Sequence, residues 1–462
     1  MASFSFLAIG PNSLLSLIGL IHGPDKTVPT PPEDWRQATV DVVIPALNEE
    51  ANIALCLASV CRQTLRPKRV ILVDDGSQDR TIEFAETLCK ANEIELIAIR
   101  RKAPIGKTPT IKRQAREFDS DVEFILDADT ILESENYIER TVQELYQAVG
   151  IASACGMVLP LRDRDRIAMC ETEPMKKFLA LVPDAPIRRP QTPWARLQQI
   201  VTDAYREILY LFLQRYVYLG QMVFFGTITN PVGCAVAYRR KYVKDLFDYY
   251  EPLYGDDLTN SEDIFIGFAL LHQGYRNIQL RDVRCRSQEP RALRLPRQLY
   301  LWSSSFLQSC YYFDALVRSP FKAIKRYRHL REVARKYGAE IREKRKIQEP
   351  YRQAFGREQT ERYGRPGGWP IFLGLVEKIS FPVVLLLLIV AGRWEALALT
   401  VGIEVALSLL VLLIITPESR FACLIKGILI QPVRYASVMY DLVIVLRFAV
   451  DLWIRKNRRW RK

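Results

Sequence analysis

Between residues 40 and 126 the chain alternates short apolar runs with segments whose apolar residues recur every three or four positions. The short runs predict β-strands, and the periodic segments predict helices. Because strands and helices follow each other in turn, we expect an α/β fold whose mostly parallel sheet is covered by helices, in one domain over residues 37–316. The expected strands are residues 40–45, 70–73, 94–99 and 122–126, and the expected helices are residues 49–61, 81–90 and 110–118.

The C-terminal third has the pattern of a membrane-attached region, divided into a basic interface region, residues 317–368, and helices within residues 369–462. Residues 371–392 and 396–416 are apolar runs long enough to span a bilayer. Residues 318–346 are basic, with apolar side chains every three or four positions. This pattern predicts an amphipathic helix at the membrane surface, with a solvated charged helix as the alternative.

Two further apolar segments have an open assignment. Residues 421–454 contain five charged side chains and are expected to be either a span or an interfacial helix. The uncharged stretch 3–21 is a marginal span or an interfacial helix, and together with a Pro-rich linker it forms an N-terminal membrane-associated region, residues 1–36. Basic segments flanking the spans are expected in the cytosol. We therefore expect a multi-pass protein of the cell (inner) membrane whose α/β domain is cytosolic.

Charge and the rarer residue types narrow the chemistry. The net charge is +13, and residues 318–365 hold sixteen Lys/Arg against six acids. Because this charge adjoins membrane segments, it favours anionic lipid over nucleic acid as the partner. The nine cysteines form no Cys-x-x-Cys pair and the chain has three histidines, which argues against a zinc site or a histidine-based triad. Carboxylates are therefore expected to carry the chemistry.

Acidic residues follow two of the expected strands. Asp74 and Asp75 come after the second, and Asp127 and Asp129 come after the fourth. The carboxyl ends of parallel strands meet at one edge of a sheet, so these side chains are expected together. Residues two apart on an extended segment project to the same side, so Asp127 and Asp129 can share one Mg²⁺ or Mn²⁺ that bridges them to a diphosphate. An isolated Asp-x-Asp is more often a solvated turn, but the second acidic pair favours a site.

Two further positions complete the candidate site. Lys107 lies in a loop before a helix, where it is expected to hold phosphate, with an ordinary exposed lysine as the alternative. Glu262 and Asp263 open an apolar helix. They either complement the helix dipole, or Asp263 is a general base whose pKa is raised by neighbouring acids that include Asp256 and Asp257.

Taken in order, these motifs resemble those of the membrane-bound family 2 glycosyltransferases, which include cellulose, hyaluronan and poly-N-acetylglucosamine synthases and some lipid glycosyltransferases. The resemblance covers about residues 40–305 and rests on VIPALNEE at 43–50, VDDGSQD at 73–79, LDADT at 126–130, and SED at 261–263 with Gly274 and Tyr275. It implies a GT-A fold and an inverting, single-displacement transfer of a sugar from a nucleotide-diphosphate sugar.

The resemblance also implies roles for single residues. Asp75 contacts the base, Asp127 and Asp129 hold the diphosphate and its metal, and Asp263 deprotonates the acceptor hydroxyl. Residues 230–234 resemble the loop that contacts the acceptor. The residues expected to bind the nucleotide sugar are Pro45, Glu49, Asp74, Asp75, Lys107, Asp127 and Asp129; the expected catalytic residues are Asp263 and Glu262; and the expected acceptor or product contacts are Gly233, Cys234, Gln298 and Trp302.

One motif departs from the family. Its Gln-x-x-Arg-Trp sequence is replaced here by Gln298-Leu-Tyr-Leu301-Trp302, so leucine stands where the arginine is expected. Because a guanidinium suits phosphate better than a neutral group does, this change argues against processive polymer synthesis unless Arg294 or Arg297 substitutes. Trp302 is expected to stack on a sugar, with a core aromatic as the alternative.

The sequence thus predicts a metal-dependent membrane glycosyltransferase that extends a growing glycan, as in exopolysaccharide synthesis. Transfer of a single sugar to a lipid acceptor is the alternative within the enzyme class, and an inactive membrane scaffold is the alternative outside it. The expected partners are a nucleotide-diphosphate sugar (first a UDP-sugar), a glycan or lipid acceptor, membrane lipids and polysaccharide-export proteins, but not nucleic acid.

Overall fold

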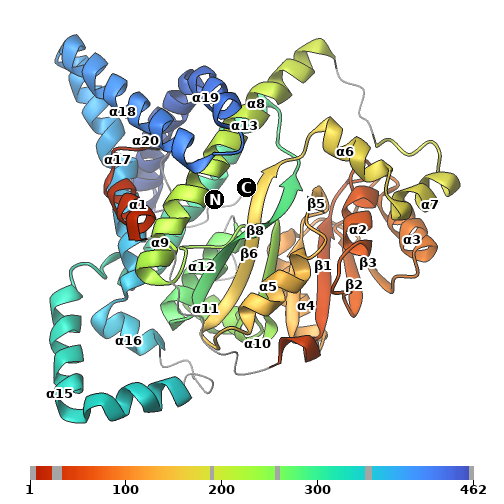
Figure 1. The fold of residues 1–462 in the computed structure, drawn as a ribbon, viewed down its shortest axis with the longest axis horizontal. Coiled ribbons are helices and arrows are strands. Elements are labelled where there is room, and N and C mark those ends of the chain that lie inside the picture. Colours follow the sequence, from red (N-terminus) through yellow and green to blue (C-terminus); the bar gives the residue numbers. More distant parts are fainter. Residues whose placement is uncertain (1–6, 23–33, 188–191, 255–260, 349–355, 457–462) are drawn as a thin grey trace.

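The fold is organised around one sheet. The computed structural model describes residues 7–22, 34–187, 192–254, 261–348 and 356–456. Within these residues eight strands pair in the order β3-β2-β1-β4-β7-β6-β8-β5, with helices packed against the sheet (Figure 1). The expected α/β fold class is confirmed. The strands are β1 (Val40–Ala46), β2 (Arg69–Asp74), β3 (Leu96–Arg100), β4 (Val122–Leu126), β5 (Thr130–Leu132), β6 (Ile151–Pro160), β7 (Ala235–Arg239) and β8 (Arg276–Ser287).

The first four strands form the parallel half of the sheet that the sequence predicts. β1 pairs in parallel with both β2 and β4, and β2 pairs in parallel with β3. Most side chains of β1, β2 and β4 are apolar and buried, as at Val42, Ile71 and Phe124, which is typical of a parallel sheet covered by helices; the edge strand β3 is only partly buried. The connecting helices are α2 (Ile53–Cys61), α3 (Thr81–Ala91) and α4 (Lys107–Glu117).

Helix α2 begins four residues later than the apolar pattern predicts. The backbone N–H of Glu49 donates to the Thr81 hydroxyl at 2.8 Å, and that of Glu50 donates to the Asp79 carboxylate at 3.2 Å. These bonds tie the segment to the loop before α3, so its N–H groups are satisfied outside a helix. Regular helix therefore starts only at Ile53.

The other half of the sheet contains two reversed strands, β5 and β7, so the sheet as a whole is mostly parallel, as expected. β7 runs antiparallel to its neighbours β4 and β6, and β5 runs antiparallel to β8, whereas β6 and β8 are parallel. The reversed strand β7 leaves β4, β6 and β8 pointing the same way. The carboxyl ends of β1, β2, β4 and β8 therefore lie along one edge of the sheet, where the candidate site is expected.

The C-terminal helices pack beside this domain. Figure 1 shows α1 (Pro11–His22), α17 (Trp369–Val390), α18 (Trp394–Ile415) and α20 (Gln431–Ala449) gathered on the side of the molecule away from α2 and α3. Between them and the sheet lie α13 (Leu295–Tyr312) and a long rod made of α8 (Pro193–Phe212), a π-helical turn (Leu213–Val217) and α9 (Tyr218–Phe225). Helix α15 (Ala323–Gln348) extends away from the body.

Three helical segments of the described chain are long and apolar enough to cross a membrane. Pro366–Val390 and Trp394–Ile415 match the two expected spans and are only 33% and 22% buried over their apolar windows. The third, Pro193–Phe225, is not expected from the sequence; it is 72% buried because it packs inside the protein. Residues 421–454 divide into α19 (Arg420–Leu429) and α20, and α19 leaves a row of apolar side chains exposed.

The charged residues within these apolar helices have partners. Glu404 on α18 is fully buried and bonds Arg434 of α20, so it faces a neighbouring helix. Lys378 on α17 lies 2.7 Å from Asp441 of α20, and Asp441 also accepts the Ser303 hydroxyl of α13 at 2.6 Å. Ionisable groups in a membrane are costly unless they are paired in this way. The pairs also bind α20 to α17, α18 and α13.

Candidate active site

The Asp75 carboxylate is held at the end of β2 by the loop before α4. It accepts the backbone N–H of Ile105 at 2.9 Å and of Gly106 at 2.8 Å, and it forms an ion pair with Arg101 at 3.0 Å. Burial alone would raise the pKa of Asp75, but these donors outweigh it and lower the pKa. The expected base contact stays a prediction; the contacts that the structure shows hold the loop before α4 in place.

Two loops beside it are linked to each other. Asn48, after β1, has a positive φ of 55°. Its side-chain oxygen accepts the N–H of Gln78 at 2.9 Å, and its own N–H donates to the Ser77 hydroxyl at 2.8 Å. Asp74 is buried and accepts the Ser77 N–H at 3.2 Å, while Gly76 takes the φ of +93° that the turn requires. Asp74 therefore shapes the turn rather than opening to solvent.

Lys107 joins three parts of the predicted site. Its ammonium lies 2.6 Å from Asp127 and 2.7 Å from Glu262, and it donates to the Gly233 carbonyl at 3.0 Å. Burial alone would lower the pKa of Lys107, but the two carboxylates raise it well above its usual value. A fixed cation thus connects the segment after β4 with the start of α12 (Glu262–Gln273) and the loop before β7.

Asp263 is placed against the loop that contains Gly233. It is 9% exposed, and the Ser261 hydroxyl donates to its carboxylate. A Cβ atom on Gly233 would lie 2.7 Å from the Cβ of Asp263, so no larger residue fits there without a shift. The next residue, Cys234, accepts the Asp127 N–H through its carbonyl at 2.9 Å. The loop therefore touches both acidic motifs. Asp256 and Asp257, which the sequence places nearby, lie outside the described residues.

Asp129 has the most perturbed carboxyl group of the site. Burial, and then the charges of Asp127 and Glu49, raise its pKa to about 8. Such mutual repulsion is relieved by a cation, so the residues present fit a divalent metal. No group of three or more metal-binding side chains occurs in the described part of the chain. Two carboxylates suffice for Mg²⁺ when substrate phosphates and water supply the remaining oxygens.

The structure adds a residue that sequence reasoning missed. Arg206 of α8 is fully buried, bonds the Gln298 side chain, and lies with its guanidinium carbon 4.2 Å from the centre of the Trp302 ring. It also forms an ion pair with buried Glu289 at 3.3 Å. The guanidinium beside the altered motif thus comes from a distant helix, in place of the suggested Arg294 or Arg297. The signal in the sequence that could have revealed Arg206 is a charged residue among the apolar residues on the buried face of α8.

Comparison with known proteins identifies the domain. The sequence profile described as "Glycosyl transferase family 2" matches residues 41–247. The chain contains a family 2 glycosyltransferase domain. The matched range includes the Asp75, Asp127 and Asp129 motifs, and the resemblance to the family 2 glycosyltransferases is confirmed.

Relatives of this family 2 domain match over limited lengths. The undecaprenyl-phosphate 4-deoxy-4-formamido-L-arabinose transferase of Pectobacterium carotovorum is 36% identical over 93 residues, which are 20% of this chain and 28% of that protein. The O-antigen chain rhamnosyltransferase RfbN of Salmonella typhimurium is 29% identical over 131 residues, 28% of this chain and 40% of that protein. The chain therefore spans less than half the length of either relative.

A solved structure aligns over more of the chain. The mannosyltransferase PcManGT from Pyrobaculum calidifontis, in complex with GDP-Man and Mn2+, covers 96% of this chain and 95% of its own, with 16% identity and a TM-score of 0.46. Within the family 2 domain, the structure brings Lys107, Asp127, Glu262, Asp263 and Gly233 together, whereas Gln298 and Trp302 meet at Arg206.

Proposed function

We propose that this protein transfers a sugar, with inversion, from a nucleotide-diphosphate sugar to an acceptor at the cytosolic surface of the cell membrane. The observation that supports it best is the contact of Lys107 with both Asp127 and Glu262. It joins the motif assigned to the diphosphate with the motif assigned to the base. A transfer reaction needs both functions around the same sugar carbon, so that the acceptor hydroxyl lies about 3–3.5 Å from the carbon it attacks.

The donor side of the mechanism rests on charge. Asp127 and Asp129 would hold a divalent metal, which neutralises the diphosphate and makes it a better leaving group. Lys107 lies beside Asp127 and is placed to exchange a carboxylate for a phosphate oxygen when donor binds. Asp75 and its loop form the nucleoside end of the site. We expect a UDP-sugar as the first donor to test.

The acceptor side rests on Asp263. Its carboxylate accepts the proton of the acceptor hydroxyl while the hydroxyl oxygen attacks the anomeric carbon. A new carbon–oxygen bond forms as the bond to the diphosphate breaks, and the leaving diphosphate takes the electron pair. Attack from the face opposite the leaving group inverts the configuration. The Ser261 hydroxyl orients the carboxylate through its hydrogen bond.

We favour a lipid-linked acceptor over the growing glycan that the sequence first suggests. Helix α13, which carries Gln298 and Trp302, bonds directly to α20, because the Ser303 hydroxyl donates to the Asp441 carboxylate at 2.6 Å. Helix α8 does so as well, since the hydroxyls of Tyr205 and Ser437 lie 3.0 Å apart. The proposed acceptor residues thus lie on helices that contact α20, which is itself paired with the candidate spans α17 and α18. Glycan extension is the second candidate, and export partners belong to that candidate alone.

Membrane attachment is supported by two helices and by the basic residues before them. The helices Pro366–Val390 and Trp394–Ile415 have the length and composition of spans, and basic residues of the interface region precede the first of them. We therefore propose a multi-pass protein of the inner membrane with the family 2 domain in the cytosol.

The test uses membranes that contain the full chain and a panel of labelled nucleotide sugars. We expect incorporation of label, and its loss by about a thousandfold in Asp263→Asn, because the general base is removed. Asp245→Asn, an exposed aspartate outside the site, is the matched control and keeps full activity. Product extracted into organic solvent supports a lipid acceptor, and product of high molecular mass supports glycan extension. Equal activity of the two variants would contradict the assignment of the base.

A further inference from the structure

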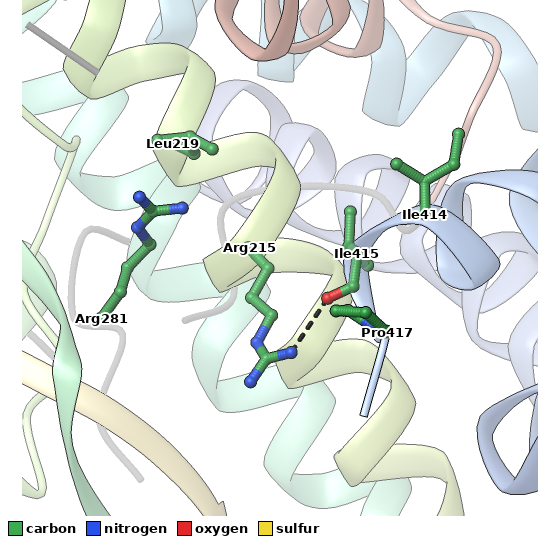
Figure 2. Close-up of a pocket in the computed structure, with 6 residues that line it drawn as sticks. All are labelled: Arg215, Leu219, Arg281, Ile414, Ile415 and Pro417. Carbon is green, nitrogen blue, oxygen red and sulfur yellow. Dashed lines mark hydrogen bonds between the residues drawn. The ribbon is translucent and has the colours of Figure 1, made fainter. Parts of the chain in front are cut away.

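A cavity lies where the end of α18 meets the α8–α9 rod and β8. Its volume is about 330 Å³, which is at the small end of ligand-binding pockets. Figure 2 shows the side chains around it, contributed by three separate parts of the chain. The lining residues are Arg215, Leu219, Arg281, Ile414, Ile415 and Pro417. All six differ from the residues assigned to sugar transfer.

One of the two arginines is already fixed. Arg215 forms an ion pair with Glu418 at 2.5 Å and donates to the Ile415 carbonyl at 2.9 Å (Figure 2). That carbonyl belongs to the last turn of α18, where main-chain acceptors have no partner within the helix. Arg215 thus caps the end of the helix, and its charge is largely neutralised by Glu418.

The other arginine carries an uncompensated charge. Arg281 on β8 is exposed, and within the described residues its side chain has no ion pair or hydrogen bond. The neighbouring carboxylate of Asp282 is bound by Arg140 at 2.7 Å and so does not neutralise it. The bond from Arg215 lowers the pKa of the Glu418 carboxyl, and the nearby charge of Arg284 adds to that effect. Positive charge therefore exceeds negative charge around the cavity, which favours an anionic ligand.

The rest of the lining is apolar and lies at the end of an apolar helix. Leu219 and Ile415 are buried, whereas Ile414 on the last turn of α18 is 59% exposed. Helix α18 has the length and composition of a membrane span. Its end is therefore expected at the level of the lipid head groups, where phosphate and the first methylenes of the acyl chains meet.

We propose that this cavity binds the phosphate head group of an anionic membrane lipid. Arg281 bonds the phosphate, and Ile414 contacts the first part of the lipid chain. The ligand class is a lipid phosphate rather than a free anion, because the cationic and apolar halves of the cavity require both parts of such a molecule. The proposal is independent of sugar transfer, since none of its residues belongs to the candidate active site.

The test measures the thermal unfolding midpoint of the purified full chain in an uncharged detergent. Titrants are short-chain phosphatidic acid, phosphatidylcholine with the same chains, and inorganic phosphate. We expect phosphatidic acid to raise the midpoint saturably. Arg281→Gln should weaken its apparent affinity about tenfold, as expected for the loss of one charge-assisted hydrogen bond, and Arg281→Lys should retain part of it. Arg66→Gln, an exposed arginine after α2, is the matched control and binds as the unmodified chain does.

A second variant tests the apolar half. Ile414→Ser removes most of an exposed side chain, so folding is preserved, and phosphatidic acid should bind several-fold more weakly. Three results would overturn the proposal. These are an equal response to inorganic phosphate, an equal response to phosphatidylcholine, and binding of phosphatidic acid that is unchanged in Arg281→Gln.

Discussion

The proposed nucleotide side and the proposed acceptor side of the candidate active site are built in different ways. On the nucleotide side, Asp75 is held by main-chain N–H groups of a loop about 30 residues away in sequence, at Ile105 and Gly106. On the acceptor side, Trp302 and Gln298 meet the buried side chain of Arg206, about 90 residues away. The nucleotide side is therefore expected to tolerate changes in side chains better than the acceptor side, whose geometry depends on the buried cation of Arg206.

The largest effect is expected at Asp129, the proposed metal ligand on the nucleotide side. Asp129→Asn should lower kcat by about a thousandfold, because a carboxylate ligand and its charge are lost. Chelation by EDTA should abolish transfer by the unmodified chain, and added Mn²⁺ or Mg²⁺ should restore it. Incorporation of labelled sugar measures both. Transfer that persists in EDTA would contradict the roles of Asp127 and Asp129.

On the acceptor side, the main expected effect of a substitution is a loss of folding stability. Arg206→Met leaves Glu289 buried without its ion-pair partner, and this should cost about 3–5 kcal/mol of unfolding free energy. Glu289→Gln in the same chain should recover much of that loss, since no unpaired charge then remains buried. Chemical denaturation of the single and double variants gives the coupling. If the losses of unfolding free energy in the two single variants simply add in the double variant, the pair is not coupled. The proposed contrast between the two sides would then be wrong.

A pH effect is expected in helix α12, which bears the proposed base. Burial, and then the charges of Arg357, Arg365 and Lys322, lower the pKa of His272 to about 4, and Tyr250 bonds its Nδ1 at 2.9 Å. The Glu361 carboxylate faces the ring at 3.9 Å. A histidine with a lowered pKa stays neutral in the folded state while the unfolded state takes up protons.

The unfolding free energy should therefore fall as the pH drops from about 6.5 to 4. His272 alone should account for about 3 kcal/mol of this loss. The comparison of the unmodified chain with His272→Asn isolates that contribution from the titration of carboxyl groups. Unfolding midpoints in denaturant at several pH values provide the measurement. If the two pH profiles run parallel, His272 titrates alike in both states.

The smallest effect is expected at Arg101. Arg101→Gln removes one of the donors to Asp75, while the N–H groups of Ile105 and Gly106 remain. We expect the KM for the donor to rise about tenfold with kcat nearly unchanged, because a charge-assisted bond is lost from the binding loop. Arg100→Gln, which alters the adjacent exposed pair with Glu86, is the control and should leave KM unchanged.

The sequence predicts the parallel half of the sheet well, since each strand is a short, mostly apolar run and two of the acidic motifs follow such runs. It predicts less of the second half. Strands β6 and β8 pair across more than 120 residues, and β7 reverses direction, which no local period reveals. Within the site, Lys107, Asp127, Glu262 and Asp263 come from motifs that are readable in order. Arg206 lies outside those motifs, so only the folded chain brings it to Trp302.

Asp441 has a consequence beyond pairing charges. It accepts the Ser303 hydroxyl of α13 and also binds Lys378 inside α17, so one carboxylate joins a membrane helix to the helix that carries Trp302. Helices in bilayers of different thickness change their tilt. If α17 spans a bilayer as its length and composition allow, a change in its tilt would reach the helix of Trp302 through these two short polar contacts.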